Sequence, residues 1–272
     1  MKRIALTALF SVFSMTACAQ PAAPQAAGAK IAVEAPKQAA VAEPVYPAGS
    51  AEARVRAALK SLNPNIKVDH VGTAPIAGFR EVVASGQVVY VSDDGKYLMQ
   101  GSLLDIAKRK DLSEAALATV RADVLKTLPT SDRIVYSPAG TPKHTVVVLT
   151  DVECGYCRKF HQEIAEHTKR GIQVEYLAFP RAGIGSPDYR KMVSVWCAAD
   201  RKKALTDAKS DRPVPSKTCT TPVDMQHAAG MRMGLTGTPM ILTPQGEFVG
   251  GYLAPDALQQ RLDQLDAARD AG

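Results

Sequence analysis

Hydrophobic positions recur at helical spacing near the start of the globular part of this chain and then change to short runs. Residues 51–62 have the helical pattern, and the Asn-Pro-Asn of 63–65 ends it. Short strand-like runs follow, with Gly86 and the Asp-Asp-Gly of 93–95 as turns between them. The runs are 66–71, 79–85, 87–92 and 96–106. The pattern predicts a small unit over 50–110, made of one helix and an antiparallel meander.

A unit of roughly sixty residues is only marginally stable alone, because it buries too little of its surface. Its sheet would also have open edges, which are templates for pairing with another chain. Pairing with a second copy satisfies both needs. We therefore predict that residues 50–110 form a dimerisation domain.

Residues 111–130 read as a helix, with a capping pattern at the start and Pro129 at the end. Its apolar stripe comprises Leu112, Ala116, Val120 and Val124. Such a helix could belong to a core. Its position between two dissimilar regions favours a linker between domains.

From about residue 131 the pattern becomes that of an α/β domain. A buried strand (145–150), a helix (154–171) and a strand (172–179) come first. Helices over 188–209 and 223–234, a hairpin of 239–243 with 247–252, and a last helix over 254–268 follow. This order resembles a thioredoxin-like domain with a helical insertion. The predicted fold class is therefore α+β with two domains, the second spanning 131–272.

The first residues are expected to be a signal peptide, 1–19. Lys2 and Arg3 precede the apolar stretch 4–15, which is too short to span a bilayer. One interpretation is cleavage before Gln20; the other is a lipoprotein box in which Cys18 is lipidated. Methionine three positions before Cys18, where leucine is preferred, favours plain cleavage. Residues 20–49, rich in Ala and Pro and without periodicity, are predicted to be a flexible tether.

Composition and charge narrow the class of protein. Hydrophobic residues make up 46% and charged residues 22%, as in ordinary globular proteins. The net charge of +6 becomes +4 without the two basic leader residues, and no basic block is interleaved with aromatic residues. Nucleic acid is therefore not an expected partner. After the leader, no apolar stretch is long enough for a transmembrane helix.

Cys154 and Cys157 in "DVECGYCRKF" carry the candidate chemistry. Cys154 ends the loop after a strand and begins a helix, where free amides and the helix dipole stabilise a thiolate. Thiols in such Cys-X-X-Cys motifs have pKa values of roughly 3.5 to 7. Cys157 lies one turn further on, within reach of the first sulfur. The motif predicts an attacking and a resolving thiol.

Other uses of these cysteines remain open. Cys197 and Cys219 could complete a zinc site, but zinc ribbons usually bring a second close pair. A purely structural bridge between Cys154 and Cys157 is disfavoured by the geometry of that spacing. For Cys197 and Cys219 we favour a structural disulfide, which would stabilise the domain by about 3 kcal/mol.

Two neighbours of the motif bear on its reactivity. Glu153 opposes thiolate formation, while Arg158 and the helix dipole favour it, and we expect Glu153 to point into solvent. His161 is interpreted as a packing or helix-surface residue rather than a catalytic one.

The segment "TGTPM" is the other informative stretch, because Pro239 stands where a strand begins. A proline there cannot donate to the sheet, which suggests a cis turn. Such a turn would leave the backbone of Thr238 free for an incoming extended chain. Alternatively, Pro239 only ends the preceding loop.

Other short motifs accompany the cysteine pair: "LTD" before it, then "YLAFPR", "WCAAD", a later lone cysteine and "GTP". Together these motifs resemble the periplasmic DsbC/DsbG-type thiol:disulfide isomerases, and the CGYC form of the cysteine motif resembles DsbC. The resemblance is dense over 134–268, and the part before it matches in layout more than in motif. It implies a V-shaped homodimer, in which linker helices carry two catalytic domains facing a shared cleft.

The resemblance also implies roles for individual residues. Cys154 would attack a wrong disulfide in a client, and Cys157 would release stalled mixed disulfides. Thr238 and Pro239 match the cis-proline pair, and with Tyr156 they form the expected client-binding set. Cys197 and Cys219 match the structural bridge.

The expected partners and location follow from the same resemblance. The expected clients are misoxidised exported proteins, which the protein would also bind in the manner of a chaperone. A membrane electron donor of the DsbD type would keep Cys154 and Cys157 reduced in the periplasm. No cofactor or metal is expected besides the redox-active disulfide. The rival hypotheses are a thiol oxidase or reductase of the same fold and a DsbG-like chaperone with limited isomerase activity. Glu153, where the family commonly has a neutral residue, and the long tether are departures from the family.

Overall fold

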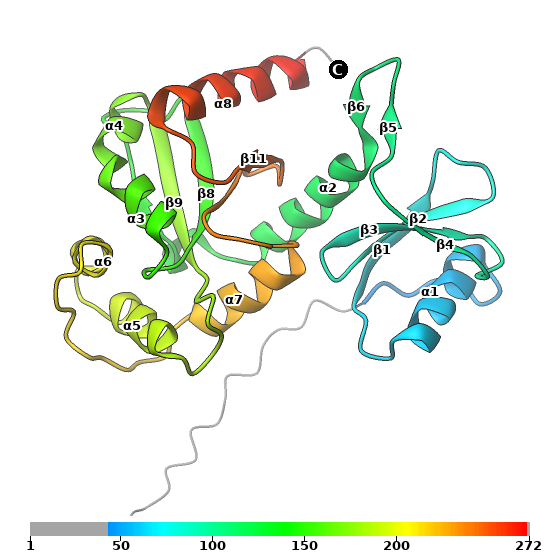
Figure 1. The fold of residues 1–272 in the computed structure, drawn as a ribbon, viewed down its shortest axis with the longest axis horizontal. Helices are drawn as coiled ribbons and strands as arrows, with labels where there is room; N and C mark the ends of the chain where they lie inside the picture. Colours follow the sequence, from blue (N-terminus) through cyan, green and yellow to red (C-terminus); the bar gives the residue numbers. More distant parts are fainter. Residues whose placement is uncertain (1–42, 271–272) are drawn as a thin grey trace, which may run out of the picture. The chain divides into compact units, whose positions relative to one another are not determined.

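The computed structural model describes residues 43–270 (Figure 1). The predicted leader with Cys18, and the predicted tether as far as residue 42, lie outside the described residues. The two-domain α+β prediction is confirmed, since one sheet precedes and a second, larger sheet follows the helix at 112–126.

The N-terminal unit is one helix on a four-stranded antiparallel sheet. Helix α1 (Ala51–Leu62) begins at Ser50, whose hydroxyl accepts a hydrogen bond from the Ala53 amide. Its Val55 and Leu59 pack into the core of the sheet. The strands β1 (Val68–Thr73), β2 (Phe79–Ala84), β3 (Gln87–Ser92) and β4 (Leu98–Gln100) follow in that spatial order.

The predicted strand at 96–106 is wrong as one element. It divides into β4 and a two-residue strand β5 (Leu104–Asp105), which pairs with β6 (Lys110–Asp111) instead. Gly101, with φ 146°, lies between β4 and β5. A backbone conformation there that side chains rarely adopt separates the two strands.

Helix α2 (Leu112–Lys126) connects this unit to the second sheet. Its N-cap Asp111 accepts a hydrogen bond from the Glu114 amide, which is the predicted start. Val120 and Val124 of the predicted stripe are buried in one core with residues of the second sheet. The helix is therefore a core helix of the following domain as well as a connection.

The second sheet has the spatial order β11-β10-β8-β9-β7, with β8 and β9 parallel and the other pairs antiparallel. The strands are β7 (Ile134–Tyr136), β8 (His144–Thr150), β9 (Ile172–Ala178), β10 (Met240–Leu242) and β11 (Phe248–Gly250). The sequence pattern missed β7, which is only three residues long. Alternate residues of β8 enter two separate cores, because side chains in a strand point to opposite faces.

Helices cover both faces of this sheet (Figure 1). They are α3 (Gly155–Gln162), α4 (Ile164–Lys169), α5 (Pro187–Trp196), α6 (Arg201–Lys209), α7 (Val223–Arg232) and α8 (Pro255–Asp270), with a 3₁₀ turn at Thr130–Asp132. Core residues of α3, α5, α6 and α8 share one face with Val223 at the start of α7, and those of α2 share the other face with Ala229 of α7.

Two predicted helices are each divided in the structure. The helix at 154–171 breaks at Glu163, which ends α3 and caps α4 with non-helical dihedral angles. The helix at 188–209 breaks after Trp196, and α6 starts anew at Asp200, whose carboxylate accepts a hydrogen bond from the Lys203 amide. An aspartate that caps a helix and an aspartate on its surface look alike in a sequence, which hid this second start.

Candidate active site

Cys154 is placed at the N-cap of α3, directly after the loop that leaves β8. Its side chain is 3% exposed, and its Sγ accepts a hydrogen bond from the Cys157 amide at 3.4 Å. In the thiol form, Sγ also donates to the carbonyl of Thr238 at 3.1 Å. The Cys157 amide of the first helical turn therefore points at this sulfur, as an anion requires.

The surroundings of Cys154 favour its thiolate. A hydrogen bond from the Cys157 thiol is the main cause, and the Cys157 amide and the charge of Arg181 add to it. Together they lower the pKa of Cys154 to about 5, although burial opposes them. At neutral pH this sulfur is a nucleophile.

Cys157 has the opposite character. It is 1% exposed, and burial together with its hydrogen bond to Cys154 raises its pKa. Cys157 therefore stays protonated while Cys154 is ionised, so Cys154 is the more nucleophilic of the two sulfurs.

Asp151 supports the loop that presents Cys154. Its buried carboxylate accepts hydrogen bonds from the Glu153 amide at 2.7 Å and from the amide of Arg181 at 2.9 Å. The Arg181 guanidinium adds a third bond at 3.1 Å. Arg181 is thereby held where its charge acts on Cys154. Neither residue was a candidate at the sequence level, although the "LTD" and "FPR" segments contain them.

Glu153 is exposed, as expected, and it is also ion-paired. Its carboxylate pairs with Arg158 at 2.6 Å and with Lys191 at 2.7 Å. Two cations neutralise it, which explains why a carboxylate next to the nucleophile is compatible with a thiolate. Lys191 lies on α5, far along the chain, so the sequence pattern did not reveal this partner.

His161 and Lys209 lie buried near the cysteine pair. Burial, and then the nearby Lys209 charge, lower the pKa of His161 to about 3, so its ring is neutral, as expected of a packing residue. Lys209 was missed entirely. It follows Leu205 by four positions on the apolar side of α6, and a lysine on that side is the signal that could have revealed it.

A groove runs past the thiolate. The peptide bond between Thr238 and Pro239 is cis, and both residues line the groove together with Tyr156. The ring of Tyr156, 65% exposed, stacks on Tyr252 with the ring centres 5.9 Å apart. Other lining residues include Arg121, Phe248 and Tyr252. The structure thus brings the three predicted client-binding residues to one surface beside Cys154.

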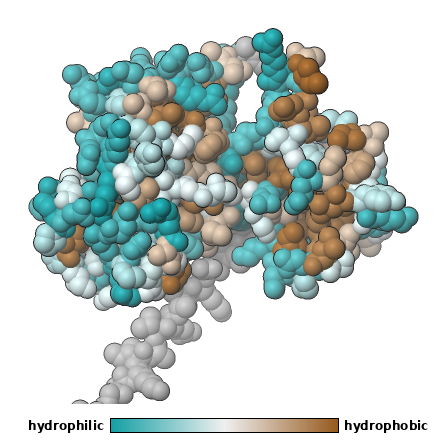
Figure 2. Space-filling view, viewed as in Figure 1, coloured by the Kyte–Doolittle hydropathy of each residue, from teal (hydrophilic) through white to brown (hydrophobic). Residues whose placement is uncertain are grey.

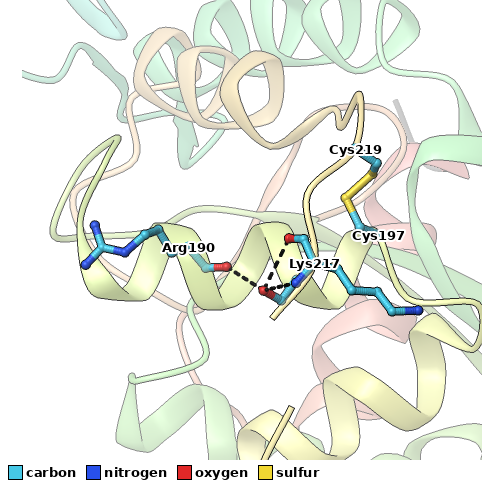
Figure 3. Close-up of a disulfide and its surroundings, with 5 residues drawn as sticks. Arg190, Cys197, Lys217 and Cys219 are labelled. Carbon is cyan, nitrogen blue, oxygen red and sulfur yellow. Dashed lines mark hydrogen bonds between the residues drawn. A yellow bond between two sulfur atoms is a disulfide. The ribbon is translucent and has the colours of Figure 1, made fainter. Parts of the chain in front are cut away.

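Cys197 and Cys219 are joined by a disulfide, and neither residue lines this groove (Figure 3). Cys197 ends α5, and Cys219 comes from the extended segment that lies along the same helix. Ser194 ties that segment to the helix, since its hydroxyl donates to the Arg190 carbonyl and accepts from the Lys217 amide. The bridge and these bonds hold an otherwise coil-like segment in place.

Metal and membrane features were also considered. Among residues 43–270, no three His, Cys, Asp or Glu side chains come together as a metal site. Within the same range, no helix has the length and apolar character needed to cross a bilayer.

Family models match both parts of the chain. A disulfide bond isomerase N-terminal domain (DsbC_N) matches residues 19–114, and a thioredoxin-like domain matches residues 132–266. Similar whole proteins include the thiol:disulfide interchange protein DsbC of Escherichia coli strain K12, 35% identical over 73% of this chain and 83% of that protein. The DsbC of Haemophilus influenzae is 36% identical over 78% of this chain and 90% of that protein.

Among solved structures, a disulfide interchange protein from Neisseria gonorrhoeae aligns with 50% of this chain and 97% of its own. The sequence identity is 28% and the TM-score 0.45.

Proposed function

This chain belongs to the DsbC family of thiol:disulfide interchange proteins, and from that premise we propose that it isomerises non-native disulfides in exported proteins. The observation that carries the proposal is the thiolate of Cys154 at the N-terminus of α3, beside an open groove. The Cys154 thiolate attacks one sulfur of a client disulfide, forms a mixed disulfide with it and releases the other client sulfur as a thiolate. The released client thiolate then attacks another client disulfide, and the thiolate freed there attacks the mixed disulfide and expels the Cys154 thiolate. Alternatively, Cys157 attacks the mixed disulfide and releases the reduced client.

The groove supports client binding at Thr238, Pro239 and Tyr156. An extended client segment would lie across the Thr238 backbone, and an apolar client side chain would pack on the stacked rings of Tyr156 and Tyr252. Lys159, whose Nζ lies 4.8 Å from the Tyr252 ring centre, braces this aromatic pair. Such a surface binds unfolded chains with little sequence preference, as a chaperone does.

The decisive experiment is reactivation of a scrambled multi-disulfide protein. The wild type restores its activity, and Cys154→Ser should reduce the rate to the uncatalysed background. Persisting activity in Cys154→Ser would contradict the redox mechanism. A net oxidase would instead produce native protein faster from the reduced client than from the scrambled client.

The chaperone component has its own measurement. Cys154→Ser should still suppress aggregation of a cysteine-free client, because the groove does not need the thiol. A variant that loses both activities together would place client binding on the cysteine itself.

We further propose a homodimer formed through the N-terminal unit. Strand β4 is one of the two edge strands of its sheet, and all three of its residues are exposed. Apolar side chains gather on this unit in Figure 2. The exposed ones of β4, β5 and their neighbours are Tyr97, Leu98, Met99, Leu104 and Ile106. A second copy could extend the sheet and cover them.

Charge placed on this edge tests the dimer. Met99→Lys should shift the mass in light scattering from two chains to one, because a buried ammonium opposes strand pairing. Leu62→Lys, at an even more exposed apolar position, on α1, should leave the dimer unchanged. A dimeric Met99→Lys variant would exclude β4 as the interface.

The location and the electron source complete the proposal. An export leader at 1–19 would direct the protein to the periplasm, where Cys18 is removed or lipidated. There a membrane donor of the DsbD type would keep Cys154 and Cys157 reduced, with the cysteine pair itself as the redox group and no metal or organic cofactor. The pair should be reduced in cells and become oxidised when that donor is deleted.

A further inference from the structure

Arg121 is a buried arginine that lines the client groove. The residue belongs to α2 and is only 6% exposed. It lines the groove together with Thr238 and Pro239. In the described part of the chain, Arg121 is the one charged residue among those that line this groove. A charge so far out of water needs hydrogen-bond partners, and its bonds show which of its nitrogens the protein uses.

Two of the three guanidinium nitrogens of Arg121 are occupied by the protein. Nε donates to the carbonyl of Met233 at 3.0 Å, and Nη1 donates to Oε1 of Glu114 at 2.5 Å. Within residues 43–270, Nη2 donates no hydrogen bond. The guanidinium is a rigid planar fork, so the two bonded nitrogens also fix the direction of the third. Since Arg121 lines the groove, Nη2 is the nitrogen left for a ligand that enters it.

The surroundings hold this guanidinium in place. The same Oε1 of Glu114 accepts a hydrogen bond from the Phe248 amide at 3.2 Å, which ties α2 to β11. The guanidinium also lies over the Phe248 ring, with 5.8 Å between Cζ and the ring centre. A donor that is already held in position loses little conformational entropy when a ligand binds. Its hydrogen bond can therefore contribute fully to affinity.

Two acidic residues that contact side chains of the groove are already paired. Glu114 accepts from Arg121, and the Tyr252 hydroxyl lies 3.0 Å from each carboxylate oxygen of Glu163. At these two positions a client lysine would meet a carboxylate that is occupied, whereas a client carboxylate would meet the unused Nη2. Hydrogen bonds from arginine to a carboxylate are also stronger than those to a neutral acceptor. The charges of the groove thus favour an anionic ligand.

We propose that Arg121 is a specificity-determining residue, which makes the groove prefer client cysteines that have an acidic residue nearby. An extended client segment lies across Thr238, and one of its Asp or Glu side chains accepts a hydrogen bond from Nη2 of Arg121. The aromatic pair of Tyr156 and Tyr252 suits apolar side chains of many kinds, so the preference for charge comes from the arginine. Because successive side chains of an extended segment point to opposite sides, the preference should be largest at alternate positions.

This inference rests on the proposed function, and one peptide series tests both. Each peptide has a single cysteine among alanine and serine residues, joined by a disulfide to methanethiol, which is small and uncharged. Glu, Gln or Lys is placed in turn at each position near the cysteine. One turnover with the reduced full-length protein converts the enzyme dithiol to its disulfide and the peptide disulfide to a peptide thiol and methanethiol. Chromatography separates the peptide thiol from its disulfide and so gives the rate.

The wild type should discriminate between the peptides by charge. At low peptide concentration, the best Glu peptide should react about tenfold faster than its Gln counterpart, the effect of one charge-assisted hydrogen bond, and the Lys peptide should be slowest. The difference should lie in the peptide concentration that gives half the maximal rate. The rate at saturating peptide should stay the same, because Arg121 binds the client away from the reacting sulfurs. High salt should weaken the preference.

Three variants separate the role of the arginine from its contribution to the fold. In Arg121→Met the ratio of the Glu to the Gln rate should fall to about one, whereas a merely structural loss would slow all peptides and keep the ratio. Glu114→Gln retains an oxygen for the Phe248 amide but removes the competing carboxylate, so it should raise the ratio. Lys126→Met removes an exposed charge of the same helix and should keep the wild-type ratio.

Several results would overturn the proposal. Glu and Gln peptides could react equally well with the wild type, which would mean that Nη2 meets only backbone carbonyls. Arg121→Met could keep the preference, or Lys126→Met could lose it as well, which would assign it to the overall charge of the protein. Failure of every peptide to react would instead remove the proposed function, and this inference with it. Alkylation of Cys154 by iodoacetamide, which is too small to need the groove, shows that each variant is folded and reactive.

Discussion

Cys154 and Cys157 are both buried and are free thiols, whereas Cys197 and Cys219 form a disulfide and Cys219 is exposed. The reactive pair is therefore not the more exposed one in this molecule. The charges and hydrogen bonds around each sulfur do. Helix amides and Arg181 act on Cys154, while the bridge of Cys197 lies at the C-terminal end of α5, where the helix dipole disfavours an anion.

The two cysteine pairs also use a disulfide bond in different ways. A bridge across a separation of 22 residues restricts the unfolded chain and so stabilises the fold. A Cys-X-X-Cys pair spans too few residues for that effect to be large, but its sulfurs can reach each other during exchange. Three measurements test this division of work, from the largest expected effect to the smallest.

Removing the bridge in the double variant Cys197→Ser, Cys219→Ser should lower the free energy of unfolding of the catalytic domain by about 3 kcal/mol. The rate of client reactivation by the folded variant should stay at the wild-type value. Urea unfolding with the active pair kept reduced measures the free energy of unfolding. The scrambled-substrate assay measures the rate of client reactivation. Slower alkylation of Cys154 in the folded variant would show that the two sites are coupled after all.

The single variant Cys197→Ser frees Cys219 and allows both kinds of thiol to be compared in one molecule. At pH 6, Cys154 should be alkylated about tenfold faster than Cys219, since its larger thiolate fraction outweighs the lower nucleophilicity of a low-pKa sulfur. With a pKa of about 5, the Cys154 rate should fall to half its plateau near pH 5. Peptide mass analysis after a short pulse of iodoacetamide gives both rates. Equal rates would remove the distinction.

Arg181→Met should have the smallest effect. Loss of this positive charge raises the pKa of Cys154, so fewer molecules are ionised where the thiolate titrates. Alkylation of Cys154 should fall about twofold at pH 5 and not at all above pH 7, a change expected of a screened charge. Arg261→Met on the exposed side of α8 is the matched control. An unchanged profile would assign the low pKa to the helix and the hydrogen bonds alone.

Local signals were sufficient for much of this protein. Ser50 and Asp111 cap α1 and α2 where the pattern predicted these helices to begin. Cys154 ends a strand loop and opens a helix, as the spacing of its motif indicated. These features depend on residues a few positions apart, so a single sequence reveals them.

What the sequence left open depends on contacts between distant segments. Asp151 and Arg181 are 30 positions apart, Glu153 and Lys191 are 38 apart, and Lys209 reaches Thr150 across 59. No periodicity reports such pairings, because each charge by itself looks like an ordinary surface residue.

The amino-acid pattern by itself determined the two-domain layout, the order of most elements and the pair of thiols at a helix start, because short-range backbone and side-chain preferences control these. Only the tertiary structure decided the charge of each sulfur, the neutralisation of Glu153 and the burial of Lys209. Burial removes water from around these groups, so their protonation depends on which distant side chains the fold brings into contact.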